Sequence, residues 1–187
     1  MSRAVIPLII TFVILGQVGV DLYLPSFGAM AVALDVAPKY IELSLSLFLL
    51  SMAMSQLFYG ALSDALGRRR VILPAILLYA AGSAVCFFAT GIAQLLAGRL
   101  LQGFAAGACV VIPRAVARDT CDGKRLAQVS VWLSVAWALV PMLAPVAGGY
   151  VQDYLGWQSN FLLIFVLAVA CWGLAFVYLP EPEKARQ

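Results

Sequence analysis

The sequence predicts an all-α membrane protein built as a bundle of six transmembrane helices. Of its 187 residues, 64% are hydrophobic and only 11% are charged, whereas a soluble domain carries roughly 25% charged residues. Apolar runs of about twenty residues, the length that crosses a bilayer as a helix, recur along the chain. Too few polar residues remain to cover an aqueous surface, so the expected solvent is lipid.

The apolar runs define six expected spans, joined by connections too short to fold separately, so we expect one domain over residues 1–187. The spans are 5–27, 41–62, 71–90, 93–113, 127–151 and 161–179. The first run also resembles a signal peptide, because Arg3 precedes it. Its length and its content of Asp21 and Pro25 favour a membrane span, and cleavage is the weaker alternative.

The distribution of Lys and Arg predicts the orientation of the bundle. If the helices alternate in direction, ten basic residues fall on one side and Lys39 alone on the other, with Arg99 inside a span. The side rich in Lys and Arg is the cytoplasmic one. Both termini are therefore expected on the cytoplasmic side of the membrane. The ten are Arg3, Arg68, Arg69, Arg70, Arg114, Arg118, Lys124, Arg125, Lys184 and Arg186.

Two charged residues lie within apolar runs, Asp21 in the first span and Arg99 in the fourth. From the helical rise of about 1.5 Å per residue, both lie roughly 9 Å below the outer edge of the membrane. Charges inside a membrane normally face a cavity or a partner, so we predict that the two side chains pair. The pair is interpreted as a proton- or substrate-responsive site, and a permanent structural ion pair is the alternative. The chain has no histidine, so a proton carrier has to be a carboxylate.

Polar residues near the same depth are candidates for lining a substrate cavity: Gln17, Tyr23 and Gln102. Gln56 in the second span fits a cavity lining and an interhelical hydrogen bond equally well. The serines of that span favour helix contacts.

Small residues and prolines mark two further surfaces. Gly103 and Gly107 follow Arg99 at four-residue spacing, which places all three on one helix face. A pair of glycines at this spacing is typical of a close helix contact. The fifth span contains two prolines and two glycines within nine positions, which predicts a bend, tight packing or both. These residues are Pro141, Pro145, Gly148 and Gly149.

The residues give no indication of enzyme or metal chemistry. Cys86, Cys109, Cys121 and Cys171 form no Cys-x-x-Cys pair, so they are expected to be packing residues. No nucleophile–base pair is recognisable at one depth. We therefore expect no catalytic residue, metal or cofactor, and a net charge of +3 gives no reason to expect a nucleic-acid partner.

The loop after the second span resembles the signature of the major facilitator superfamily. It reads Gly60-Ala-Leu-Ser-Asp64-Ala-Leu-Gly67-Arg68-Arg69-Arg70. Three further segments are similar to elements of the same superfamily. They are Arg99-Leu-Leu-Gln102-Gly103 in span four, Ala144-Pro145-Val-Ala-Gly148-Gly149 in span five and Asp21-Leu-Tyr-Leu-Pro25 in span one. The last of these resembles drug exporters of the Bcr/CflA group.

The resemblance implies a drug/proton antiporter driven by the proton gradient. It assigns proton coupling to Asp21 and Arg99, and closure of the cytoplasmic side to the loop residues Gly60, Asp64, Gly67, Arg68 and Arg69. The prolines and glycines of span five would form the antiporter element, a kinked and packed joint that prevents leakage.

The superfamily has twelve spans in two halves, and this sequence matches the N-terminal six. The substrate site in such folds lies between halves. Transport is therefore expected from a parallel homodimer or from pairing with a separate second half. A non-transporting six-helix fragment or membrane scaffold is the alternative. The expected partners are the lipid bilayer and a small-molecule substrate.

Overall fold

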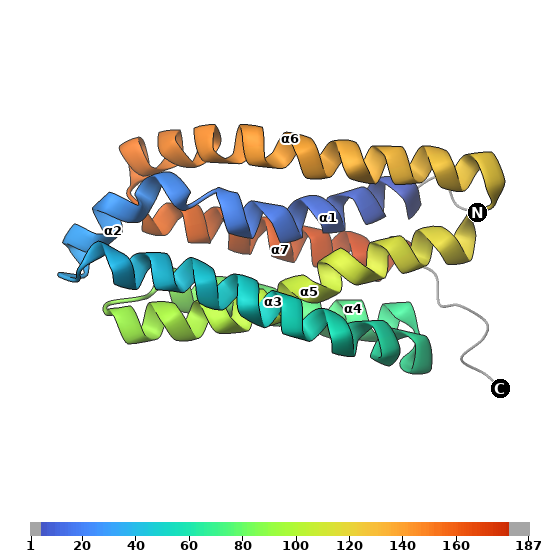
Figure 1. The fold of residues 1–187 in the computed structure, drawn as a ribbon, viewed down its shortest axis with the longest axis horizontal. Helices are drawn as coiled ribbons and strands as arrows, with labels where there is room; N and C mark the ends of the chain where they lie inside the picture. The colour runs from blue at the N-terminus through green and yellow to red at the C-terminus, as the bar shows by residue number, and fades with distance from the viewer. Residues whose placement is uncertain (1–4, 180–187) are drawn as a thin grey trace.

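The computed structural model describes residues 5–179, and within this range it consists of helices and their connections, without strands. Seven α-helices and one short 3₁₀ helix follow each other along the chain (Figure 1). The α-helices are α1 (Val5–Asp21), α2 (Phe27–Ala33), α3 (Pro38–Leu66), α4 (Arg68–Phe87), α5 (Ile92–Thr120), α6 (Gly123–Leu155) and α7 (Gln158–Tyr178). The 3₁₀ helix, Leu24–Ser26, lies between α1 and α2.

Six helical segments in the described range are long and apolar enough to cross a membrane, which confirms the predicted number of spans. The segments extend past the predicted limits at most ends. For example, α6 has 33 residues and α5 has 29. The helical hydrogen-bond ladder does not stop where the apolar run stops. It continues until a residue such as Gly67 or Gly156 adopts a positive φ and ends the helix.

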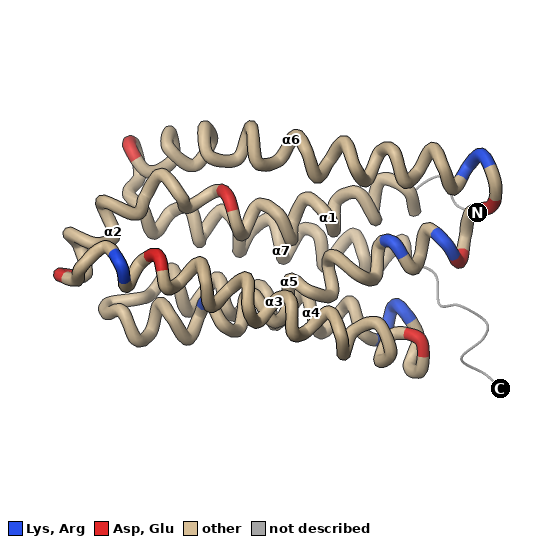
Figure 2. Tube along the Cα trace, in the orientation of Figure 1, with Lys and Arg blue, Asp and Glu red and all other residues tan. Residues whose placement is uncertain are grey.

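The long helices run alternately up and down the bundle (Figure 1). As a result, the α3–α4 and α5–α6 connections lie at one end, and Figure 2 shows most of the described Lys and Arg residues gathered there. The arrangement agrees with the predicted charge asymmetry. Which end faces the cytoplasm stays a prediction, and Arg3, Lys184 and Arg186 lie outside the described residues.

The first span differs from the single helix expected over residues 5–27. It continues to Ala33, but α1 ends at Asp21 and regular α-helix resumes only at Phe27. Pro25 explains the break, because it has no amide hydrogen to donate to the carbonyl of Asp21 four residues earlier. The carbonyl groups in the last turn of α1 are therefore open to other donors.

The contact between α3 and α5 is made by small residues. A Cβ atom on Gly103 would overlap the backbone of Phe48 and the hydroxyl of Ser51, and one on Gly107 would overlap the hydroxyl of Ser55. Ser51 and Ser55 are buried and donate to carbonyls of their own helix. The predicted glycine contact surface is confirmed, and these serines belong to the helix contact.

Only a narrow stripe of α6 is buried, although most of the helix between its polar ends is apolar. The stripe consists of Val129, Leu133, Ala136, Val140, Ala144 and Gly148. Large side chains such as Trp132, Met142 and Tyr150 are exposed, and α3 shows the same pattern. In a membrane these outward faces require lipid or another helical unit as their neighbour.

Tyr79 ties α4 to α1 in the middle of the bundle. It is fully buried, and its hydroxyl donates to the Leu15 carbonyl at 2.9 Å. Tyr79→Phe leaves that carbonyl without this donor, so we expect a loss of about 1 kcal/mol of unfolding free energy. Thermal or denaturant unfolding in detergent measures the loss. Tyr154→Phe, at a side chain that is 81% exposed, serves as the control, and equal effects of the two substitutions would contradict the assignment.

Candidate functional site

Arg99 on α5 lies fully buried at the centre of the candidate site. Its guanidinium carbon is 4.1 Å from the ring centroids of both Tyr23 and Phe48. Its Nη1 donates to the Gly19 carbonyl at 2.9 Å and to Oε1 of Gln102. The Nε and Nη2 atoms have no hydrogen-bond partner in the described structure. The cation is thus held by carbonyl oxygens and aromatic faces.

The predicted pairing of Asp21 with Arg99 is wrong. Within residues 5–179, the ion pairs join Arg68 to Asp64 and to Asp119. The common depth was correct, since Arg99 reaches Gly19, two residues before Asp21. Rotation explains the miss, because positions two apart on a helix are about 200° apart around its axis. The open carbonyl groups at the negative end of α1 receive the cation instead.

Asp21, the last residue of α1, is only 7% exposed. Its carboxylate accepts one hydrogen bond, from Nε2 of Gln17 at 3.4 Å. Gln17 therefore lies beside the acid, as its depth suggested. Asp21 is therefore a buried carboxylate without a cationic partner among the described residues.

The other predicted cavity residues have different surroundings. Tyr23 is fully buried, and its hydroxyl is 3.2 Å from the hydroxyl of Ser44 on α3. Gln102 is buried between Arg99 and Ser83, and its Nε2 donates to the Ser83 hydroxyl at 2.7 Å. Tyr23 and Gln102 thus belong to the buried network around Arg99. Gln56 lies apart from this network, near the Gly107 contact of α3 with α5.

Sequence reasoning missed three members of the site: Phe48, Ser83 and Phe161. Phe48 and Phe161 present their rings to Arg99, the second at 6.0 Å. Each lies in an apolar run where a phenylalanine is ordinary, so neither carried a signal. Ser83 connects Gln102 to the Tyr79 carbonyl by its own hydrogen bond of 2.9 Å. Only the packing of four helices brings these side chains together.

The predicted gate loop forms a compact charged joint at the basic end. Arg68 is 14% exposed and pairs with Asp64, and its Nε donates to Asp119 on α5 at 3.0 Å. Arg68 Nη1 also donates to the Ser63 hydroxyl at 2.6 Å. Gly67 makes the turn with φ of +96°, a conformation that favours glycine. Asp119 was not predicted as a member of this joint, whereas Gly60 at 4.0 Å from Val111 makes no tight contact.

Arg69 holds the end of α7 against the loop. Its Nη2 donates to the Phe176 carbonyl at 2.6 Å and its Nη1 to the Leu179 carbonyl at 3.2 Å. Replacing Arg69 by Gln removes the charged donor. We expect amide exchange over residues 175–179 to become roughly fivefold faster, about 1 kcal/mol of local opening. Hydrogen exchange with mass spectrometry measures this, and Lys124→Gln, an exposed basic residue at the same end, should leave it unchanged. Unchanged exchange in the Arg69 variant would refute the role.

The predicted antiporter element lies on α6, which is continuous through Pro141 and Pro145. Its tight contact is at Gly148, where a Cβ atom would overlap the Leu22 carbonyl. The Gly148 carbonyl also accepts from Nδ2 of Asn160 at 3.2 Å, and the same amide donates to Ser26 at 2.9 Å. The packing interpretation is confirmed at Gly148. Gly149 is looser, with Pro25 at 3.9 Å.

Comparison with known proteins decides the family. Residues 8–187 match the family model described as Major Facilitator Superfamily. The chain belongs to this superfamily. Membership makes it a transporter-type protein rather than an enzyme, as predicted. The described residues contain no group of three or more His, Cys, Asp or Glu side chains placed to hold a metal ion.

Curated relatives carry drug-resistance names. The chain is 34% identical over 166 residues to a bicyclomycin resistance protein homolog of Haemophilus influenzae, covering 89% of this chain and 42% of that protein. It is 35% identical over 173 residues to the multidrug resistance protein MdtL of Escherichia coli, covering 92% and 44%. These names agree with the resemblance to the Bcr/CflA group. The chain spans less than half the length of these relatives.

A solved structure has the same fold. The human organic anion transporter MFSD10 (TETRAN) superposes with a TM-score of 0.73 at 24% sequence identity, covering 98% of this chain and 49% of that one. The likeness establishes the fold of the six-helix unit as half of a major facilitator fold.

Proposed function

We propose that this chain forms the N-terminal half of a proton-coupled secondary transporter in the bacterial inner membrane, exporting small drug-like compounds. It acts as a parallel homodimer or together with a second six-helix half. The drug-resistance names of its relatives support the substrate class. The proton gradient supplies the energy, without a cofactor.

The observation that carries the proposal is the separation of two buried charges. Asp21 has no cationic partner and Arg99 has no carboxylate partner within the described structure. A carboxylate held in a permanent ion pair would stay deprotonated throughout the transport cycle and would therefore carry no proton. Asp21 is free to gain or lose a proton without breaking such a pair, and buried ionisable residues in membrane helices generally serve transport.

A second helical unit is required to complete the substrate site. The apolar faces of α3 and α6 are open along the bundle, and the chain spans less than half of the relatives that it matches. A second half placed against these faces would enclose a substrate cavity between the two halves, which is where substrates bind in such folds.

Transport by the 187-residue chain in inverted membrane vesicles tests the proposal. Vesicles that contain the chain are expected to accumulate ethidium after acidification of their lumen, and an uncoupler should abolish the accumulation. Native mass spectrometry of the same preparation identifies the chain as monomer or dimer. Accumulation no greater than in vesicles without the protein, from a chain that is folded and dimeric, would refute transport by the homodimer.

The second candidate function is a non-transporting membrane scaffold. The burial of Arg99, which is held by the Gly19 carbonyl and by Gln102, favours it because a fixed cation of this kind also serves packing. A folded six-helix monomer without ethidium accumulation would support the scaffold and exclude transport by this chain alone.

A further inference from the structure

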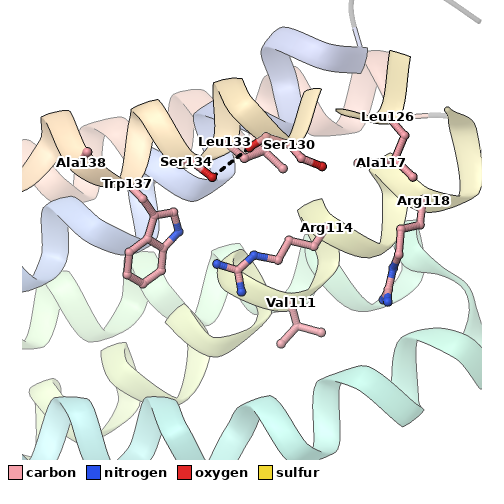
Figure 3. A pocket seen from close by; sticks show the side chains of 10 residues that line it. All are labelled: Val111, Arg114, Ala117, Arg118, Leu126, Ser130, Leu133, Ser134, Trp137 and Ala138. Carbon is pink, nitrogen blue, oxygen red and sulfur yellow. Dashed lines mark hydrogen bonds between the residues drawn. The ribbon is translucent and has the colours of Figure 1, made fainter. Parts of the chain in front are cut away.

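The cavity between α5 and α6 lies on the side of the bundle that the proposed second half would cover. Its volume is about 770 Å³, and Figure 3 shows Arg114, Arg118 and Trp137 around it. A separate feature is the junction around Asn160, where α7 begins beside the break in the first span. None of the residues that form this junction lines the cavity.

Asn160 joins α7 to two segments that are distant from it in the chain. Its Nδ2 donates to the hydroxyl of Ser26, in the 3₁₀ helix after α1, at 2.9 Å. The same nitrogen donates to the carbonyl of Gly148 on α6 at 3.2 Å. Asn160 and Ser26 are both fully buried. A single side chain therefore ties α7, α6 and the break in the first span to one another.

The oxygen of the same amide has no use in the packing. Oδ1 of Asn160 is buried and has no hydrogen-bond partner in the described structure. A buried acceptor without a donor costs free energy. A leucine would fill a similar volume without this cost. The two bonds that the amide donates, and not its packing, therefore explain an asparagine at this position.

Ser26 supports the same interpretation. It is the N-cap residue of α2, where a serine hydroxyl ordinarily accepts from an amide in the first turn of the helix. That capping bond is absent, and the hydroxyl accepts from Asn160 instead. A helix of seven residues without a cap is too short to be stable by itself. The start of α2 therefore depends on the bond from α7.

The junction lies one residue from Asp21. Leu22 follows Asp21 directly, and its carbonyl packs so closely against Gly148 that a Cβ atom at Gly148 would overlap it. The carbonyl of Gly148 is one of the two acceptors of Asn160. A shift of α6 against α7 at this point would therefore move the backbone that carries the Asp21 carboxylate.

Phe161 extends the junction toward Arg99. It follows Asn160 on α7, and its ring centroid lies 5.5 Å from that of Tyr23. The Tyr23 ring in turn lies 4.1 Å from the Arg99 guanidinium carbon. The first turn of α7 thus holds the break at two points, at Tyr23 through an aromatic ring and at Ser26 through a hydrogen bond.

We propose that Asn160 is a positioning residue of the proton site. Its two hydrogen bonds hold the break in the first span, so that Asp21 and Tyr23 keep fixed positions at the site. The inference rests on the proposed function, because that function assigns the proton to Asp21. Asn160 acts through the segments that it joins, since its own hydrogen bonds go to Ser26 and Gly148.

Hydrogen exchange with mass spectrometry, on the 187-residue chain in mild detergent, tests the junction without requiring transport. Asn160→Leu removes both donated bonds at similar volume. The amides of residues 22–27 are expected to exchange roughly 25-fold faster, about fivefold for each lost bond. Ser26→Ala removes one of the two bonds, so about fivefold is expected. The thermal midpoint of the Asn160 variant should stay near that of the parent, because the variant also loses the unpaired Oδ1.

Ser159→Ala is the matched control. Ser159 precedes Asn160 on α7, and its hydroxyl donates to the Leu155 carbonyl at 2.8 Å. The control therefore also removes a side-chain hydrogen bond at the start of α7, but one that does not reach the first span. Exchange over residues 22–27 should stay within about twofold of the parent, because local opening depends on the bonds of the segment itself.

Ethidium transport in inverted vesicles separates positioning from a general loss of structure. Accumulation driven by an acidified lumen requires a proton to bind and to leave. Exchange of labelled for unlabelled ethidium at equal pH requires no net proton movement. Both Asn160→Leu and Ser26→Ala are expected to slow proton-driven accumulation about fivefold through misplacement of the carboxylate, and to leave ethidium exchange within about twofold of the parent.

Three results would overturn the proposal. The first is exchange over residues 22–27 that is the same in the Asn160 variant as in the parent. The second is an equal effect of the Asn160 and Ser159 variants. The third is an equal slowing of proton-driven accumulation and ethidium exchange, which is the effect of a purely structural residue. If the parent accumulates no ethidium while Asn160→Leu still opens residues 22–27, the proposed function fails and the role of Asn160 in holding the break stands.

Discussion

Asp21→Asn is expected to reduce proton-coupled efflux at least tenfold while leaving the bundle folded. Asparagine has nearly the same shape and still accepts the hydrogen bond from Gln17, which the carboxylate accepts at 3.4 Å. It does not take up or release a proton, so the coupling step is lost. Because an ionised carboxylate inside a membrane is costly, the thermal midpoint should be unchanged or higher.

Loss of transport without loss of stability distinguishes a proton carrier from a structural residue. Ethidium accumulation in acidified inverted vesicles and thermal unfolding in detergent, measured on the same preparation, separate the two. Glu42→Gln is the matched control, because Glu42 is an exposed carboxylate on α3 and should retain full transport. Efflux by the Asp21 variant at the parent rate would remove Asp21 from the coupling mechanism.

Gly103→Ala is expected to destabilise the bundle by about 2–3 kcal/mol, since overpacking a tight interior typically costs 1–3 kcal/mol. The added methyl would overlap the Phe48 backbone and the Ser51 hydroxyl. A backbone atom cannot rotate away as a side chain can, so α3 and α5 have to separate. Phe48 also presents its ring to Arg99 at 4.1 Å, so the separation should disturb the candidate site as well.

Gly173→Ala is the comparison variant, and it is expected to leave the stability of the bundle unchanged or to raise it. No atom lies within 4 Å of a Cβ placed at Gly173 on α7, and alanine favours a helix over glycine by up to about 1 kcal/mol. Unfolding in detergent should therefore show a lower midpoint for the Gly103 variant and an equal or higher one for the Gly173 variant. Equal midpoints for the two would show that the α3–α5 contact is not tight.

The sequence predicted the depth of the two charged residues in the membrane, but it did not predict the direction in which their side chains point. The distance of Asp21 and Arg99 from the ends of their spans placed both at one level, and Arg99 does contact the last turn of α1. The prediction of an ion pair between them was wrong because the rotation of each helix about its axis depends on all its packing partners. Pro25 was the available signal for the break that opens the Gly19 carbonyl, but a proline does not indicate which donor will use the freed group.

The gate loop was predictable for a different reason. Asp64, Gly67 and Arg68 are close in sequence, so their joint is largely local, with the turn at Gly67 requiring a positive φ. The remaining member, Asp119, lies 51 residues after Arg68. Its participation depends on the way α5 ends beside the loop, which local spacing does not contain.

The sequence by itself determined the solvent, the number of spans and the charged end of the bundle. These properties follow from run length, hydrophobicity and the placement of Lys and Arg, each of which is set by residues near in the chain. Only the tertiary structure decided which groups hold Arg99, why Gly103 and Gly148 must be glycine, and that Arg114, Arg118 and Trp137 share a cavity. Those features arise where separate helices meet, and the meeting depends on rotation and close packing that no local pattern specifies.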